Sequence, residues 1–247
     1  MEADLNGKVV LVTGSARRVG RAIALAFARQ GAHLVIHHHA SDDAAAQTAR
    51  DIEALGVRTL VVKADQSAPD DVARLFATVQ SHFGRLDVLI NSAANYLKDD
   101  FLDIEYAAWQ KALGVNLTGP FLCSQHAARL MIASESAGTI INIADNGGLR
   151  PWKSRPHHSI AKAGVIMLTR VSALSLGPHN IRVNAVVPGP VLPPPGADEN
   201  AWAHFEDRLP LRRTGHPDDV AQACIFLATN HFVTGAILNV DGGEILV

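Results

Sequence analysis

Cysteine is scarce in this sequence, which contains only Cys123 and Cys224, far apart in the chain and each within an apolar segment. A disulfide scaffold or a cysteine-based metal site needs more thiols at closer spacing. We therefore expect both side chains to be buried, reduced thiols.

Strong net charge and long apolar runs are also missing. The chain has 22 Lys and Arg against 24 Asp and Glu, which gives no broad attraction to nucleic acid or to an anionic membrane. No uninterrupted apolar run approaches the roughly 20 residues of a membrane span. Residues 1–4 contain no basic region followed by an apolar stretch. We expect a cytoplasmic protein that acts on a small molecule.

Short apolar runs alternate with longer helical segments along the chain. Runs that are apolar throughout, separated by helices, predict a parallel sheet covered on both faces. With right-handed crossovers, this order predicts an α/β, Rossmann-type doubly wound sheet of about seven strands in a single domain, 1–247. The apolar runs are 8–13, 33–37, 57–63, 86–90, 139–143, 181–187 and 236–240, and the helical segments are 21–30, 42–55, 71–83, 105–131, 158–176 and 218–228. Within 105–131, Gly119-Pro120 predicts a break.

The first strand leads into a glycine-containing turn, Thr13-Gly14-Ser15-Ala16-Arg17-Arg18-Val19-Gly20. Gly14 permits a tight turn, and Gly20 lets the following helix pack closely. The N-terminus of that helix directs free N–H groups at a pyrophosphate. Taken alone, the segment also fits a plain strand-to-helix turn.

Further motifs extend this turn into a family resemblance. Thr-Gly-x-x-x-Gly-x-Gly marks the short-chain dehydrogenases/reductases, and residues 13–20 match it except that Arg18 replaces the middle Gly, as in pteridine reductases. The other matching motifs are Asn-Ser-Ala-Ala at 91–94, Val-Asn-Leu at 115–117, Asn-Ala-Val-Val-Pro-Gly at 184–189, Thr-Gly at 234–235 and Val-Asp-Gly-Gly at 240–243. Because order and spacing agree, the chain resembles this family over essentially its whole length.

The resemblance implies that a nicotinamide dinucleotide binds at the carboxyl ends of the strands. Asp65 and Gln66 stand at the adenine-binding position, and Pro188 to Val191 stand beneath the nicotinamide. The segment around 190–210 is expected to be a substrate lid. The implied cofactor contacts are Gly14, Arg17, Arg18, Val19, Gly20, His38, His39, Ser41, Asp65, Gln66, Asn91, Ser92, Ala93, Lys162, Pro188, Gly189 and Val191.

The end of the second strand favours NADPH over NADH. An acidic residue there binds the ribose hydroxyls and repels a 2′-phosphate, whereas this chain has His38 and no carboxylate before Asp42. Arg18 adds positive charge nearby, and Ser41 adds a donor. NADH stays open, because pteridine reductases carry a further Arg where this chain has Ala40.

Three consecutive histidines, residues 37–39, raise the question of a metal. Metal sites usually need three or four ligands, and the sequence offers no partner cluster. We expect no metal here and interpret the histidines as lining the adenosine pocket.

The family transfers hydride between nicotinamide and a carbonyl group or, in pteridine reductases, a C=N bond. By resemblance, a Tyr four residues before a Lys carries the proton, the Lys holds the nicotinamide ribose, and a Ser thirteen residues before the Tyr polarises the substrate. This chain keeps Lys162 but has His158 at the Tyr position and Asp145 at the Ser position, and pteridine reductases share that Asp. Asn116 matches the Asn that binds a water behind the Lys.

Two interpretations of His158 stay open. In the first, the chain is an NADPH-dependent short-chain reductase of a small C=O or C=N substrate, with a pterin as one hypothesis. Imidazole titrates near pH 6.5, so His158 paired with Asp145 donates the proton as hydride arrives. In the second, imidazole is too short to reach the substrate, and the chain binds a dinucleotide as a non-catalytic sensor or oligomer partner. The resemblance also implies a homodimer or homotetramer formed through the helices at 105–131 and 158–176.

Overall fold

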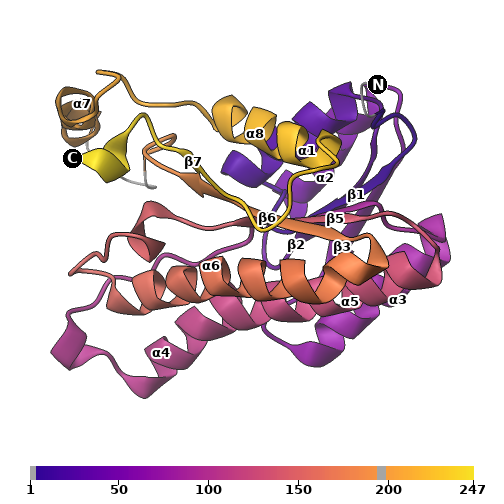
Figure 1. Ribbon diagram of the computed structural model, residues 1–247, viewed down its shortest axis with the longest axis horizontal. Coiled ribbons are helices and arrows are strands. Elements are labelled where there is room, and N and C mark those ends of the chain that lie inside the picture. Colours follow the sequence, from indigo (N-terminus) through magenta and orange to yellow (C-terminus); the bar gives the residue numbers. More distant parts are fainter. Residues whose placement is uncertain (1–3, 194–198) are drawn as a thin grey trace.

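The computed structural model of the protein describes residues 4–193 and 199–247, in which seven parallel strands form one sheet with the order β3-β2-β1-β4-β5-β6-β7 (Figure 1). The strands are β1 (Val9–Val12), β2 (His33–His38), β3 (Thr59–Lys63), β4 (Val88–Asn91), β5 (Thr139–Ile143), β6 (Arg182–Pro188) and β7 (Ile237–Val240). The order reverses direction between β1 and β4, which is the switch point of a doubly wound sheet. The predicted fold class is confirmed.

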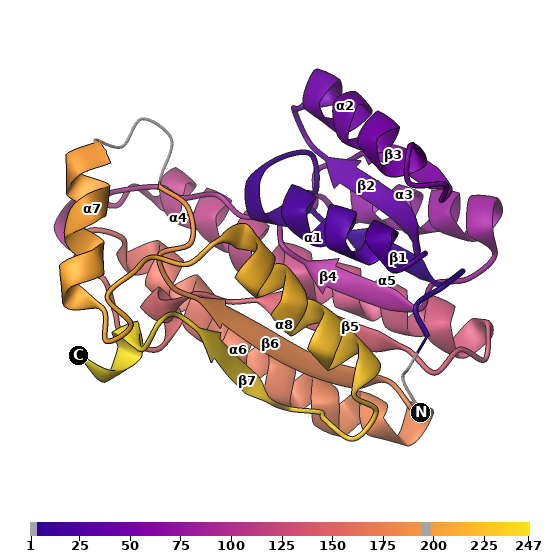
Figure 2. The same cartoon turned by 90° about the horizontal axis from the view of Figure 1, so that it is seen from above.

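Helices cover both faces of the sheet (Figures 1 and 2). One layer contains α1 (Arg18–Arg29), α2 (Asp42–Glu53) and α8 (Pro217–Thr229), and the other contains α3 (Pro69–Phe83), α5 (Gly119–Ala133) and α6 (Pro156–Leu176). In β1, Val10 and Val12 belong to the core under α1 and α8, whereas Val9 and Leu11 belong to the core under α3 and α5. Because successive side chains of a strand point to opposite faces, both faces of β1 are buried, and its residues are all apolar.

The ends of α3 illustrate how local sequence sets these helices. Pro69 stands in its first turn beside Asp70 and Asp71, where a missing N–H is harmless and negative charge is favourable. Gly84 ends the helix with a φ of +71°, a left-handed conformation that suits glycine.

The predicted break in the long helical segment lies one turn earlier than expected. The chain forms α4 (Tyr106–Leu113), a π-helical turn η2 (Gly114–Thr118) and then α5, which contains Pro120 in its first turn. Pro120 has no N–H to donate to the carbonyl of Asn116, four residues earlier, and its ring crowds that carbonyl. The wider π-turn absorbs this conflict, so the irregularity precedes Gly119-Pro120.

Both cysteines are buried, free thiols, as expected from the sequence. Burial raises the pKa of Cys123 to about 12 and raises the pKa of Cys224 further. Neither thiol is therefore prepared to act as a nucleophile at neutral pH.

Helix α6 combines a buried face with an exposed apolar one. The segment Pro156–His179 is long and apolar enough to cross a membrane by length and composition, a feature that inspection of uninterrupted runs missed. Its inner face packs through Ala161, Val165 and Ile166 in the interior beside β6. Its outer face exposes apolar side chains, among them Met167, Val171 and Leu174.

Candidate functional site

The candidate site lies where the strands end, on the side of the molecule that also holds α4, α7 (Glu199–Arg208) and the C-terminus (Figure 1). The loops that follow β1 to β6, together with α6 and the turn η2, supply the residues named from the sequence. Ligands of doubly wound sheets bind at this edge, near the point where strand order reverses.

The turn after β1 leaves no room for side chains at its glycines. Gly14 has a φ of +68°, and a Cβ on it would lie 2.8 Å from the Cα of Ala93. A Cβ on Gly20 would overlap the carbonyl oxygen of Gly14. Helix α1 starts here without a side-chain cap and with no acidic residue in its first turn. Its first N–H groups are therefore suited to an anionic group such as a pyrophosphate.

His37 holds this turn in place from β2. The Gly14 N–H donates to His37 Nδ1 at 3.1 Å, and His37 Nε2 lies 3.0 Å from the carbonyl oxygen of Ala64. Since Nδ1 accepts, Nε2 carries the proton and the ring is neutral. Burial lowers the pKa of His37 to about 4, which keeps it so. Sequence reasoning grouped His37 with a pocket lining and missed this structural role.

The segment after β4 is fixed against the same turn. Thr13 Oγ1 accepts the N–H groups of Ser92 and Ala93, each at 3.0 Å. Gln66 Nε2 donates to the carbonyls of Ala93 at 3.1 Å and Val115 at 2.7 Å. The Nε2 of Gln66 is buried and committed to two backbone carbonyls, so a contact of Gln66 with an adenine would not use this group and would fall mainly to its backbone.

Two other expected cofactor contacts also turn their side chains into the protein. Asn91 Nδ2 donates to Asn142 Oδ1 at 2.8 Å inside the sheet. Asp65 Oδ1 accepts the N–H and hydroxyl of Ser67, at 2.9 and 2.7 Å. Contact with a cofactor would fall mainly to the backbone of these residues, because Asn91 Nδ2 is committed to an acceptor inside the sheet and Asp65 Oδ1 to local donors.

The end of β2 gathers polar groups suited to the adenosine side of a dinucleotide. A guanidinium N–H of Arg17 donates to Ser41 Oγ, and the Ser41 N–H donates to His38 Nδ1 at 3.4 Å. Asp42 is paired with Lys63 at 3.0 Å, which neutralises the first carboxylate after the strand. His39 is exposed beside this group.

Arg18 is placed differently from Arg17. It has a φ of +56°, and its guanidinium donates to the carbonyl of Pro193 at 2.8 Å. Arg18 therefore ties the start of α1 to the segment after β6. Residues 194–198, which belong to the expected lid, lie outside the described residues, and α7 follows them.

The nicotinamide-side residues follow β6. Pro188 and Gly189 are partly exposed, and the Gly189 N–H donates to the Val240 carbonyl at 3.0 Å. Val191 is buried against the core that contains α1 and α8, with Val19 packed against the same core. Any contact of Val191 with a carboxamide would therefore use its backbone.

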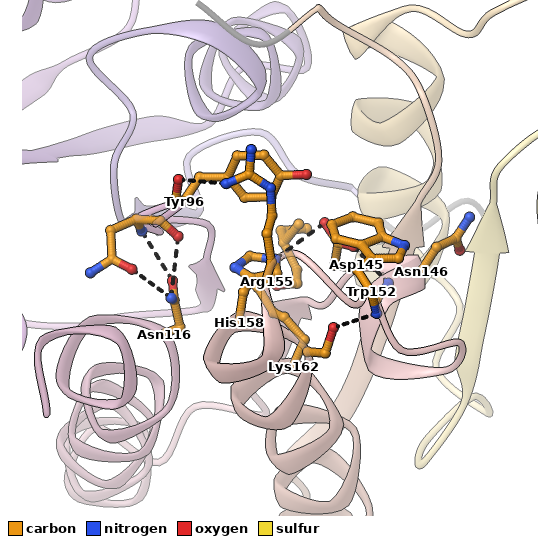
Figure 3. A network of polar contacts seen from close by, with 12 residues as sticks. Tyr96, Asn116, Asp145, Asn146, Trp152, Arg155, His158 and Lys162 are labelled. Carbon is orange, nitrogen blue, oxygen red and sulfur yellow. Dashed lines mark hydrogen bonds and ion pairs between the residues drawn. The ribbon is translucent and has the colours of Figure 1, made fainter. Parts of the chain in front are cut away.

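Lys162, Asp145 and His158 converge beyond β5 (Figure 3). Lys162 is buried on α6, and its Nζ donates to the carbonyl of Ile143 at 2.7 Å. Burial lowers the pKa of Lys162 to about 8, and the carboxylate of Asp145 opposes this. Asp145 Oδ1 accepts the Gly147 N–H at 2.8 Å, and its Oδ2 lies 3.6 Å from His158 Nε2.

Aromatic side chains cover His158, and the sequence did not point to them. The Trp152 ring lies parallel to the imidazole with centroids 5.8 Å apart, and the Tyr96 ring meets it edge-on at 5.0 Å (Figure 3). Both nitrogens of His158 are buried and lack a hydrogen-bond partner. An imidazole held this way retains unused hydrogen-bonding capacity, which is expected of a residue that acts on a ligand.

Asn116 lies in the π-helical turn, away from the ring of His158 (Figure 3). Its Oδ1 accepts the Asn95 N–H at 3.0 Å, and its Nδ2 donates to Asn95 Oδ1 at 2.7 Å. The side chain thus anchors the loop after β4. The expected water-binding role would fall to its backbone, because its amide is already paired.

No group of three or more His, Cys, Asp or Glu side chains suited to a metal occurs within 4–193 and 199–247. His37 faces inward and holds its two hydrogen bonds, whereas His39 is exposed. The histidine triplet does not bring its side chains together around one point.

Comparison with known proteins agrees with this architecture. A family profile described as "Enoyl-(Acyl carrier protein) reductase" matches residues 14–244. The L-rhamnose 1-dehydrogenase (NAD(P)(+)) of Sphingomonas sp. strain SKA58 is 36% identical, over 97% of this chain and 96% of that protein. The 3-oxoacyl-[acyl-carrier-protein] reductase of Synechocystis sp. strain PCC 6803 is 36% identical, over 98% of each.

A solved structure is similar throughout as well. The short-chain type dehydrogenase/reductase of Mycobacterium marinum superposes with a TM-score of 0.91 at 33% identity, over 98% of this chain and 96% of that one. Fold, motif order and these similarities agree over nearly the full length of the chain. The protein therefore belongs to the short-chain dehydrogenase/reductase family of oxidoreductases.

Proposed function

We propose that the protein is an NADPH-dependent short-chain reductase that interconverts a small C=O or C=N compound and its reduced form, with His158 as proton donor. The observation that carries the proposal is the convergence of Lys162, Asp145 and His158 at the carboxyl end of β5. When bound, the reduced nicotinamide supplies a hydride. The protein's own residues have to hold the reactants and supply the proton.

The dinucleotide has a suitable place at the start of α1. The uncapped N–H groups of its first turn match a pyrophosphate. Thr13 and His37 hold the turn and the segment after β4 in fixed positions. A preorganised backbone of this kind lowers the entropic cost of binding.

The end of β2 supports NADPH over NADH. Arg17 and Ser41 are already joined by a hydrogen bond and together offer donors for a 2′-phosphate. Asp42 is neutralised by Lys63 and so does not repel that phosphate. The name of the Sphingomonas relative allows either cofactor, so NADH remains the alternative.

Each of the three ionisable groups has a distinct task in this proposal. Protonated His158 gives a proton from its ring to the substrate oxygen or nitrogen as hydride reaches the adjacent carbon. Asp145, 3.6 Å from Nε2, stabilises the imidazolium. Lys162 donates one N–H to Ile143 and keeps two for the nicotinamide ribose.

A cavity beside Trp152 bears on the substrate class. It has a volume of about 370 Å³ and lies between the loop after β5, the end of α7 and the C-terminus. Trp152 and Phe205 line it together with Arg150, Arg208 and Glu244. Aromatic faces and charges of both signs suit a small polar molecule, such as a sugar or a pterin, better than a long acyl chain.

One observation favours the alternative, a non-catalytic dinucleotide-binding protein that serves as a sensor or oligomer partner. His158 is only 3% exposed, and Trp152 and Tyr96 lie against its ring. If neither ring moves, no substrate atom reaches the imidazole. Binding of NADPH alone fits both functions, so turnover has to decide.

Self-association is part of the proposal. On α6, Ile160, Met167, Val171 and Leu174 are exposed on one face, Leu174 over 82% of its surface. Phe121 on α5 adds to the exposed apolar surface. Helical spacing and size favour a face that packs against a second copy. Leu174→Glu should lower the mass measured by light scattering, whereas Leu55→Glu on the opposite layer should not.

The test of the main proposal is a turnover assay. Purified protein is given NADPH with 7,8-dihydropterin, a quinone or a 3-oxoacyl thioester, and NADP⁺ with L-rhamnose, beside His158→Ala and His158→Tyr. Turnover by wild type and its loss in His158→Ala support His158 as the proton donor. An inert wild type that binds NADPH, with activity gained only in His158→Tyr, would establish the non-catalytic alternative.

A further inference from the structure

At positions 145 and 158, where the family resemblance implies a hydroxyl group, this chain has an ionisable carboxylate and imidazole. Asp145 stands at the Ser position, and an ionised carboxylate accepts hydrogen bonds but donates none. His158 stands at the Tyr position, and its ring proton is the one assigned to the substrate. A substrate oxygen at this site thus has no neutral O–H donor from either position to polarise it.

Tyr96 is the hydroxyl-bearing side chain packed against His158. Its ring meets the imidazole at 5.0 Å and 89°, and it meets the Trp152 ring at 6.0 Å and 90°. The three rings form one cluster, and the Tyr96 hydroxyl points to the side where Asp145 lies (Figure 3). Tyr96 is 44% exposed, whereas the imidazole behind it is almost fully buried. A ligand that approaches the imidazole therefore meets Tyr96 first.

The loop that carries Tyr96 is fastened to the start of α6. An N–H of Arg155 donates to the carbonyls of Tyr96 at 2.9 Å and Leu97 at 3.0 Å. The same guanidinium lies over the Tyr96 ring, 3.5 Å from its centroid. Arg155 therefore fixes both the backbone and the ring of Tyr96, which is more than a surface tyrosine needs.

Anchors on both sides of Tyr96 complete the arrangement. Asn95 is paired with Asn116 on one side. On the other side, His157 Nε2 lies 3.0 Å from Asp99 Oδ2, and His157 Nδ1 accepts the His158 N–H at 3.0 Å. Hydrogen bonds through His157 thus connect Asp99, on the loop that carries Tyr96, to the backbone of His158.

The Tyr96 hydroxyl is suited to donate a hydrogen bond rather than to lose its proton. Burial raises the pKa of Tyr96, and the guanidinium of Arg155 only partly opposes this. The hydroxyl stays protonated through neutral pH and remains a hydrogen-bond donor.

We propose that the Tyr96 hydroxyl donates a hydrogen bond to the substrate oxygen or nitrogen and polarises it for hydride transfer, in place of the hydroxyl missing at position 145. This inference rests on the proposed function. His158, packed against Tyr96, has an Nδ1 without a hydrogen-bond partner that gives the substrate atom a second contact. Proton transfer stays with His158, and Tyr96 keeps its own proton.

The test uses the fact that the chain has two tyrosines, Tyr96 and Tyr106. Tyr96→Phe keeps the ring and removes the hydroxyl. Tyr106→Phe is the matched control, because Tyr106 is 72% exposed at the start of α4. With the substrate that wild type turns over fastest in the panel above, Tyr96→Phe should lower kcat on the order of 100-fold. KM and the unfolding temperature should change little, and Tyr106→Phe should match wild type.

A second readout does not depend on turnover. Tyr96 is the single tyrosine of the Tyr106→Phe protein and Tyr106 that of the Tyr96→Phe protein, and both keep the same three tryptophans, so the difference between their ligand-induced difference spectra reports the tyrosines. Adding NADP⁺ and the reduced product should shift the tyrosine absorbance of the Tyr106→Phe protein and leave that of the Tyr96→Phe protein unchanged.

The outcomes separate this inference from the function on which it rests. Active wild type with an unchanged kcat in Tyr96→Phe, or with a loss confined to KM, refutes the role of Tyr96 alone. A wild type that binds NADPH but reduces nothing in the panel overturns the proposed function, and the role of Tyr96 falls with it.

Discussion

His37 provides a test of the forces that hold the turn after β1. The ring is buried, its Nδ1 accepts the Gly14 N–H, and burial lowers its pKa to about 4. In the unfolded chain a histidine titrates near 6.5, so between these values the unfolded state binds more protons. The free energy of unfolding therefore falls as the pH falls from about 6.5 to about 4. At about 1.4 kcal/mol per pKa unit, the full loss from this group is about 3 kcal/mol.

Urea unfolding near neutral pH and near pH 4.5 measures this loss. His37→Asn keeps a side-chain oxygen that can accept the Gly14 N–H, but it does not titrate. The decrease on acidification should therefore be about 2 kcal/mol smaller in His37→Asn than in wild type. His231→Asn is the control, because His231 is exposed. His38, His39 and Asp65 surround His37 and are the same in all three proteins. Equal pH dependence in wild type and His37→Asn would refute the reasoning.

Three further variants test the turn at Gly20, the ammonium group of Lys162 and the side-chain amide of Gln66. Gly20→Ala should weaken NADPH binding at least tenfold by fluorescence titration, because the new Cβ overlaps the adjacent turn, whereas Gly177→Ala has open space and should leave binding unchanged. Because burial lowers the pKa of Lys162 to about 8, wild-type kcat should fall as the pH rises through about 8. If kcat falls over the same pH range in Lys162→Arg, the assignment to Lys162 is wrong. Gln66→Leu leaves two partly buried carbonyls without this donor and should lower the free energy of unfolding by about 1–3 kcal/mol in urea; no change would show that water replaces the amide.

The fold could be predicted from sequence because local and global signals agree. The central strands β1, β4 and β5 are buried on both faces and are mostly apolar, and the helices between strands end at residues such as Gly84. The one misplaced feature was the break near Pro120. A proline marks strain in its own turn, but the backbone relieved that strain one turn earlier, and a one-dimensional pattern does not carry that information.

The candidate site could be predicted only where local turn or helix geometry fixes the position of a residue. Gly14 and Lys162 lie where their motifs suggested, because turn geometry and helix spacing are local properties. Gln66 points inward, since two carbonyls from distant loops compete for its amide. Tyr96 and Trp152 were missed, because nothing in their neighbouring sequence indicates that folding brings them onto His158.

The substitutions at positions 145 and 158 are best understood as one change. A tyrosine at 158 beside Asp145 would put a phenol next to a carboxylate, which disfavours the tyrosinate. An imidazole in that position instead gains from the carboxylate when it is protonated, and Oδ2 lies 3.6 Å from Nε2 to provide that stabilisation. In the proposed mechanism, Asp145 therefore supports a protonated His158. With Asp at position 145, the site lacks a hydroxyl there to donate a hydrogen bond to a substrate oxygen. In the proposed mechanism the hydroxyl of Tyr96, on a different loop that is held by Arg155, takes this role.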